Sequence, residues 1–189
     1  MSDYPNRPVL KYWVVRVLGK MPTFAGLNFL VSITTSKAAT IMEIYEDKMS
    51  IKAALAQFFE RFGFQADAYT AKWFAIYVGK FPIYLPNIPS RVWVARFHDI
   101  HHVLTGYPAN WRGEAEIGAW EIATGCRTSL VAWFLNGGAV FVGLFLWPRA
   151  VLRAFKRGWR TRTNLYHDFD YDSLLGMTVQ ELRQKIGLA

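Results

Sequence analysis

Three of the four histidines in this chain lie within five consecutive positions, in the segment His98-Asp-Ile-His101-His102. On an α-helix, which turns by ~100° per residue, His98 and His102 lie on one face, one turn apart. This spacing lets two imidazole rings reach the same metal ion. Asp99 and His101 flank the pair on opposite sides, each ~60° from one of the two rings. The helical period alone leaves open which of them would be a third ligand.

Two carboxylates that can complete such a site follow the histidines. Glu114 lies beyond the turn at residues 106–108, on a helix predicted over 112–124. Glu121 comes seven residues later on the same face, where it could orient a ligand, carry a proton or lie at the surface. Two imidazoles with one or two carboxylates suit zinc, iron, cobalt or manganese. We therefore expect one divalent metal ion in residues 91–125 and no organic cofactor.

Other classes of histidine site are excluded by the small number of histidines. His98-x-x-His101-His102 matches one histidine box of the membrane desaturases, but those enzymes need several boxes and only His167 remains. Metal-dependent phosphohydrolases need a further histidine upstream, and none precedes His98. Carboxylate-bridged di-iron bundles need paired Glu-x-x-His motifs, which this sequence lacks. A histidine pair on a helix surface is the remaining alternative to a metal site.

Helical periodicity dominates the rest of the chain, and strand alternation is weak. Ser50 is a suitable N-cap for a helix that Gly63 closes, and Thr178-Val-Gln-Glu181 is a capping box that begins a terminal helix. Other helices are predicted at residues 27–46, 67–79, 90–105 and 112–124. We therefore expect an all-α fold, a single helical domain over residues 1–189, with the metal site between two helices.

The segment FPIYLPNIPS at residues 81–90 holds three prolines. It cannot be the interior of a helix, because proline lacks the backbone N–H and clashes with the preceding turn. We predict a connector here, after which Ser90 caps the helix that carries the histidines.

An apolar run and a basic run follow each other in the second half of the chain. Residues 129–147 carry no charge and have the length of a transmembrane helix. Asn136-Gly137-Gly138 is predicted to split them into two pieces that form an in-plane hairpin or line an apolar tunnel. Basic side chains follow at Arg149, Arg153, Lys156, Arg157, Arg160 and Arg162. A basic amphipathic helix with aromatic anchors is typical of an anionic membrane surface, so residues 129–162 are expected to face a membrane.

The composition limits the partners and the compartment. A formal net charge of +8 favours an anionic partner. No RNA-recognition motif accompanies the basic run, so we expect anionic lipid and no nucleic acid. Cys126 is the only cysteine and can form neither a disulfide nor a thiolate zinc site within one chain. The amino terminus resembles no signal or transit peptide, which predicts a cytoplasmic protein bound peripherally to the inner face of the cell membrane.

The long-spaced motif resembles that of a known family. His98-Asp99-x-x-His102, eleven residues and then Glu114 is similar to the signature of the coenzyme Q biosynthesis protein 4 family. The residues around this motif are also similar to those of the family, at Gly106, Pro108, Asn110, Gly113 and Glu121. The C-terminal segment resembles the family around Leu182, Arg183 and Gly187. The similarity covers residues 91–125 and 163–189. The proline-rich connector has no counterpart that we can match.

The resemblance implies an all-helical, peripheral membrane protein of ubiquinone synthesis. It implies that His98, Asp99, His102 and Glu114 are the metal ligands and that His101 is a neighbour. In one version the family is an enzyme that replaces the carboxyl group of a polyprenylated hydroxybenzoate-type ring with a hydroxyl group, by oxidative decarboxylation. In the other it is a scaffold that binds the polyprenylated ubiquinone precursor and organises other ubiquinone biosynthesis proteins. Pairing of two chains into a homodimer is left open.

Overall fold

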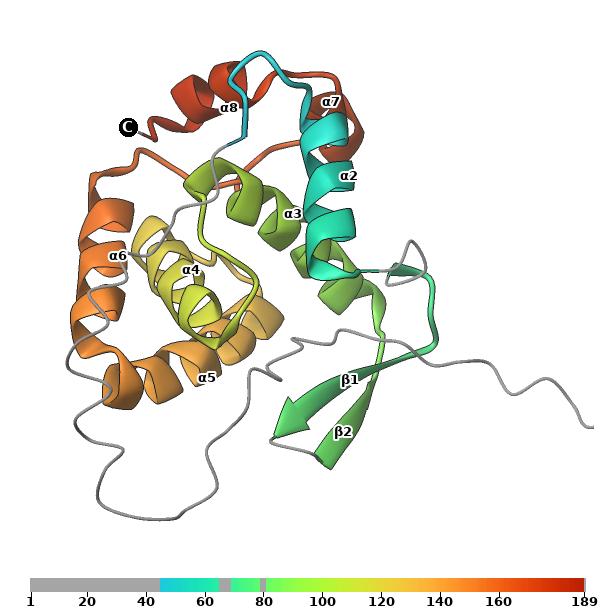
Figure 1. The fold of residues 1–189 in the computed structure, drawn as a ribbon, viewed down its shortest axis with the longest axis vertical. Helices are drawn as coiled ribbons and strands as arrows, with labels where there is room; N and C mark the ends of the chain where they lie inside the picture. The colour runs from blue at the N-terminus through green and yellow to red at the C-terminus, as the bar shows by residue number, and fades with distance from the viewer. Residues whose placement is uncertain (1–44, 65–68, 79–80, 189) are drawn as a thin grey trace, which may run out of the picture.

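Helices make up most of residues 45–64, 69–78 and 81–188, which are the residues that the computed structural model describes (Figure 1). The helices are α2 (Ile51–Phe62), α3 (Pro89–Thr105), α4 (Trp111–Thr124), α5 (Leu130–Leu146), α6 (Pro148–Arg160), α7 (Tyr171–Leu175) and α8 (Val179–Ile186). Two strands, β1 (Trp73–Val78) and β2 (Phe81–Pro86), complete the order. The predominantly helical fold is therefore confirmed. The helix predicted at 27–46 lies outside the described residues, apart from its last two positions.

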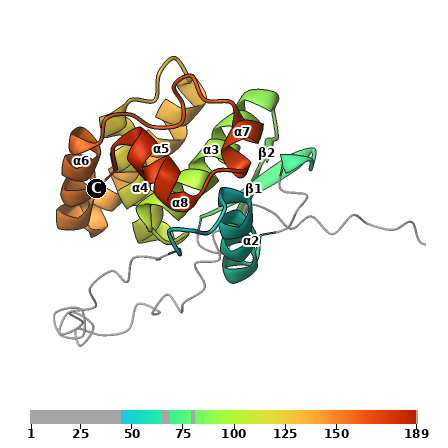
Figure 2. The same cartoon turned by 90° about the horizontal axis from the view of Figure 1, so that it is seen from above.

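The histidine helix α3 lies in the middle of the fold. It contacts α2, α4, α5 and α8, and Figures 1 and 2 show these helices on different sides of it. Residues 97–105 of α3 are all buried. A helix buried on every side can hold polar residues only where they find partners inside the protein, and the histidines are such residues.

Close packing of α4 against α5 and α6 depends on two glycines. A Cβ atom at Gly158 would lie 2.6 Å from the Trp120 carbonyl oxygen, and one at Gly143 would lie 2.3 Å from the Ala115 Cβ. Any side chain at these positions would push the helices apart, because both distances are shorter than a van der Waals contact. The glycines therefore fix α4, which carries both glutamates of interest, between its two neighbours.

An antiparallel hairpin stands where the sequence predicted a helix followed by a connector. Strands β1 and β2 pair with Trp73 opposite Pro86. The residues of β1 are mainly aromatic or β-branched, and such side chains fit a pleated strand. Both strands are edges of a two-stranded sheet, so Pro82 and Pro86 are tolerated. The predicted helix over 67–79 is therefore wrong in its described residues, since 69–72 form no α-helix and Trp73–Val78 is a strand, and the fold is not strictly all-α.

The helix ends follow the predicted caps, with one exception. The Ser50 hydroxyl accepts the Ala53 N–H, and the capping box of Thr178 with Glu181 is present. Gly106 closes α3 in a left-handed conformation, with φ of 77°. The start of α3 differs from the prediction, because Ile88 is the N-cap and Ser90 already lies in the first turn.

The apolar run forms one continuous helix, so the predicted split and the in-plane hairpin are wrong. Helix α5 passes through Asn136-Gly137-Gly138 without a break. Each glycine costs ~1 kcal/mol of helix propensity, but the buried Asn136 amide donates a hydrogen bond to Glu121 Oε2 at 2.6 Å. This contact stabilises the middle of α5. Among the described residues, none of the helices combines the length and apolar character needed to cross a bilayer.

The outer side of α5 and α6 leaves large apolar side chains in contact with solvent. Phe134 is 77% exposed, Phe145 is 73% exposed and Trp159 is 73% exposed. The predicted basic helix is present as α6, on which Arg149, Arg153, Lys156 and Arg160 are exposed. Its buried side consists mainly of small residues, Ala150, Val151, Ala154 and Gly158. We call these exposed side chains of α5 and α6 the outer face.

Candidate metal centre

Three side chains converge between α3 and α4. The Nε2 atoms of His98 and His102 lie 3.1 Å apart. Glu114 brings its Oε2 to 3.3 Å from His98 Nε2 and its Oε1 to 3.4 Å from His102 Nε2. One ligand atom from each residue lies within 4.8 Å of the other two. The structure therefore brings together three of the four predicted ligands.

The far nitrogen of each ring has an acceptor as its partner. His98 Nδ1 lies 2.9 Å from Glu121 Oε1, and His102 Nδ1 lies 2.8 Å from the Tyr107 carbonyl oxygen. A carboxylate and a carbonyl only accept hydrogen bonds, so each ring carries a proton on Nδ1. A ring that carries only this Nδ1 proton presents its Nε2 lone pair to the other ring and to Glu114. Metal-ligating histidines are held by the same pattern of outer partners.

Two imidazole lone pairs and a carboxylate repel one another unless a cation lies among them. In a tetrahedral zinc site with bonds of ~2.05 Å, neighbouring ligand atoms are about 3.3 Å apart. The observed separations of 3.1, 3.3 and 3.4 Å lie close to this value. Three protein ligands also leave a position open, as in catalytic rather than structural zinc sites. The donor set therefore fits a divalent metal ion.

The pKa values of the metal-free cluster favour a positive charge at the same place. Burial opposes ionisation of Glu114, but the neighbouring histidines outweigh it and lower its pKa to about 2. Burial also disfavours a charged His98, yet Glu121 and Glu114 raise its pKa well above the ordinary value. The pKa of Glu121 is held below its usual range, because His98 and His101 outweigh its burial. Without a metal, a proton on His98 supplies the missing positive charge.

Asp99 lies buried beside the cluster but is not one of the three convergent residues. Its Oδ2 atom accepts a hydrogen bond from the Tyr69 hydroxyl. Burial raises the pKa of Asp99, although His98 and Tyr69 act in the opposite direction. Its role as a fourth ligand stays a prediction that the family resemblance implies.

His101 is turned away from the cluster, with both ring nitrogens in use. Its Nδ1 lies 2.6 Å from Glu121 Oε1, and its Nε2 accepts the Leu165 N–H at 2.9 Å. Burial lowers its pKa, so the ring is neutral. Neither Asp99 nor His101 therefore belongs to the cluster of His98, His102 and Glu114. His101 lies next to the cluster and does not point a free nitrogen into it.

A cavity of about 520 Å³ lies beside the cluster, and His98 and Glu114 form part of its wall. The wall is otherwise mainly apolar and includes Phe74, Trp111, Trp133, Phe134 and residues 136–139 of α5. At Gly137 and Gly138 a Cβ atom would meet nothing within 4 Å, so these residues leave the cavity wide. The expectation that the apolar run lines an apolar space is thus met by one helix instead of two pieces.

Arg91 places a positive charge in this wall. Its side chain is only 3% exposed, and its guanidinium lies 4.2 Å from the centre of the Phe74 ring. Its Nη1 donates to Asn87 Oδ1 at 2.9 Å. Burial lowers the Arg91 pKa to about 10, which leaves the group charged at neutral pH.

Sequence reasoning did not identify Arg91, Tyr69 or Tyr107 as parts of the site. Arg91 looks like any basic residue at the start of a helix, and Tyr107 acts through its backbone carbonyl, which no side-chain pattern reveals. Asn136 had a visible signal, because it is the only amide in a long apolar run. A single polar residue in such a run indicates a buried partner.

No protein-family model, curated protein or solved structure matches this chain. The interpretation of the site therefore rests on its donor geometry and on the sequence resemblance of residues 91–125, and membership of the family stays a proposal.

Proposed function

We propose that this protein is a metal-dependent enzyme of ubiquinone synthesis that acts on a polyprenylated hydroxybenzoate-type ring. The observation that carries the proposal is the position of the His98, His102 and Glu114 cluster at the edge of an otherwise apolar, aromatic cavity. Such a cavity suits a ligand that is largely apolar and has one oxygen-rich end. A carboxyphenol with an isoprenoid tail has this chemistry.

His98, His102 and Glu114 would hold the metal, with Asp99 as the further ligand that the resemblance implies. When bound, a divalent ion supplies a Lewis acid that binds carboxylate and phenol oxygens, and iron or cobalt adds redox capacity that zinc lacks. Arg91 favours an anionic head group in the same cavity, since its buried guanidinium lines the wall. The aromatic side chains of the wall would pack against the ring.

The proposed reaction is a two-electron oxidation with dioxygen as the oxidant. The bond between the ring and its carboxyl carbon breaks, a bond from the same ring carbon to oxygen forms, and carbon dioxide leaves. Two electrons pass to dioxygen for each ring. With water as the source of the new hydroxyl oxygen, the second product is hydrogen peroxide, and atoms and electrons balance.

The outer face supports uptake of this substrate from a membrane. Phe134 lines the cavity and is also 77% exposed, so the cavity wall continues into the outer face. Exposed basic residues follow on α6, where Trp159 and Arg160 are neighbours in the chain. Apolar anchors next to basic residues favour an anionic membrane surface. We propose peripheral attachment at the inner face of the cell membrane, where other ubiquinone biosynthesis proteins would be partners.

The decisive experiment incubates metal-loaded protein with a prenylated 4-hydroxybenzoate and dioxygen and measures carbon dioxide and hydroxylated ring. Turnover is expected with wild-type protein, and much less is expected with His102→Ala or with the same acid lacking its prenyl chain. Tight binding of the prenylated acid without turnover, with every divalent metal tried, would reject the enzyme. That result would favour the alternative of a lipid-binding scaffold for the ubiquinone biosynthesis complex.

A further inference from the structure

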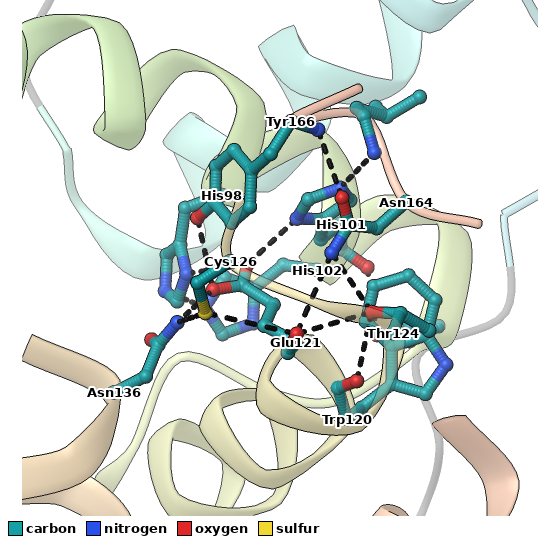
Figure 3. Close-up of polar contacts among 12 residues, drawn as sticks. His98, His101, His102, Trp120, Glu121, Thr124, Cys126, Asn136, Asn164 and Tyr166 are labelled. Carbon is teal, nitrogen blue, oxygen red and sulfur yellow. Dashed lines mark hydrogen bonds and ion pairs between the residues drawn. The ribbon is translucent and has the colours of Figure 1, made fainter. Parts of the chain in front are cut away.

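Glu121 is a fully buried carboxylate with four hydrogen-bond partners. Its Oε1 lies 2.9 Å from His98 Nδ1 and 2.6 Å from His101 Nδ1. Its Oε2 accepts from the Asn136 amide at 2.6 Å and from the Tyr166 hydroxyl at 2.9 Å. Figure 3 shows Glu121 at the centre of these side chains. The donors come from α3, from α5 and from the segment that follows α6.

We propose that Glu121 is a positioning residue of the metal centre, and that its charge, not only its shape, is what the centre requires. The inference rests on the metal site of the proposed function and deepens it. Glu121 keeps the His98 proton on Nδ1, so His98 offers Nε2 to the ion. A negative charge next to Nδ1 also makes His98 a stronger electron donor.

Saturation of the carboxylate argues for positioning over proton transfer. A carboxylate offers about four lone-pair sites, and the four donors around Glu121 occupy that number. A proton carrier needs a lone pair that a proton can reach. Burial of an ion is also costly unless its charge is used. A fixed negative charge beside His98 has such a use, because it holds the proton on Nδ1 and makes the ring a stronger electron donor.

His101 and Tyr166 also hold the carboxylate in place. The His101 ring links Glu121 to the Leu165 N–H, and the Trp120 ring packs against it with centroids 5.1 Å apart. Tyr166 follows directly in the chain and donates to the other oxygen. The third histidine of the motif therefore acts on the metal centre through Glu121, without being a ligand.

Asn136 connects the same carboxylate to the cavity. It lies in the cavity wall together with His98, and its amide donates to Glu121 Oε2. The middle of α5 and the ring of His98 thus share one rigid anchor. A change in α5 at this position is expected to reach the metal ligand without touching the metal.

The test compares Glu121→Gln with Glu116→Gln in the full chain, using Co²⁺ as the probe. Glu116 is a matched control because it is a buried carboxylate on the same helix, is 4% exposed and pairs with Arg112, not with a histidine. Affinity is measured by competition with a chelator, and the visible absorption of bound Co²⁺ reports its ligand field. Thermal melts of the metal-free variants report folding.

We expect Glu121→Gln to weaken Co²⁺ binding by about 10- to 100-fold, the range for outer partners of metal ligands, and to shift the absorption. Glu116→Gln should leave both unchanged. Wild-type affinity and spectrum in a folded Glu121→Gln would overturn the inference while the metal centre stood. No Co²⁺ binding by the wild-type chain would overturn the proposed function as well.

Tyr166→Phe keeps the inference testable if Glu121→Gln gives no cooperative melt. This variant removes one donor to Oε2 and leaves the ring in place. A smaller loss of affinity, of about threefold to tenfold on the scale of one hydrogen bond, with a shifted spectrum is expected. An unchanged affinity and spectrum would count against a positioning role.

Discussion

The candidate metal centre buries polar side chains, whereas the outer face of α5 and α6 exposes large apolar ones. Glu121 and His101 are both 0% exposed, while Phe134 and Phe145 are 77% and 73% exposed. Each region reverses the usual distribution, and a buried polar group or an exposed apolar patch is more informative than its opposite. Buried ionic groups and exposed apolar area are both costly alone.

The difference indicates which kind of partner each region would suit. In the candidate metal centre, lone pairs and carboxylates converge, an arrangement that suits a cation. At the outer face, exposed apolar rings and exposed basic side chains occur on α5 and α6, so the partner that we propose there is apolar and anionic. Helix α5 belongs to both regions, because Asn136 binds Glu121 while Phe145 remains exposed.

Removal of a metal ligand should have the largest effect of these changes, a loss of metal binding at the buried polar cluster. Elemental analysis of wild-type protein should give about one divalent metal per chain. His98→Ala, His102→Ala or Glu114→Ala should reduce affinity by more than the roughly 100-fold that the loss of an outer partner costs. His101→Ala should keep the stoichiometry at saturating metal. Equal loss in His101→Ala would show that His101 is a ligand after all.

Replacement of two exposed rings should weaken membrane binding at the outer face and leave metal binding unchanged. Phe141 and Phe145 are 64% and 73% exposed and contact each other with ring centroids 5.1 Å apart. Burial of one such ring stabilises by ~1.5 kcal/mol or more, so Phe141→Ser with Phe145→Ser should weaken binding to anionic vesicles by on the order of 100-fold. Metal content should not change. Ile88→Ser, at a residue 45% exposed outside this face, is the control. Equal weakening in that control would contradict a specific face.

The metal affinity of the buried cluster should depend on pH. The His98 pKa is raised in the metal-free protein, so below that raised pKa the metal must displace a proton. Affinity should therefore rise by about tenfold per pH unit until the His98 pKa is passed, with release of about one proton. Glu114, with its pKa near 2, stays ionised throughout this range. Titration calorimetry in buffers of different ionisation enthalpy measures the proton. Affinity that does not depend on pH would contradict the assignment of His98.

Loss of one basic side chain from α6 should have the smallest effect, a modest weakening of vesicle binding. Arg160 is exposed on α6, and each base near an anionic surface contributes ~1 kcal/mol, so Arg160→Gln should weaken vesicle binding about fivefold. The difference between the variant and the wild type should shrink at high salt, because exposed charges are screened. Vesicle co-sedimentation at two salt concentrations measures it. An effect equally large on neutral vesicles would exclude an electrostatic cause.

Local pattern predicted most of the helical structure and the core of the site. The spacing of His98 and His102 on a helix, and the turn that returns Glu114 to them, depends on residues close in sequence. Helical period and caps act over a few positions, so the elements around the site were predictable. The hairpin was missed because its strands depend on pairing across a turn, and prolines read as breaks when no partner strand is known.

The sequence by itself determined the donor set, the basic helix and the apolar run, since residue type and short spacing decide each of them. Only the tertiary structure decided that α5 is continuous, that Glu121 is buried, and that Asp99 meets Tyr69 while His101 meets Leu165. These contacts join residues 15 to 64 positions apart. Contacts at such separations are formed by the packing of helices and not by local propensity, and a buried carboxylate finds its four donors only when several elements close around it.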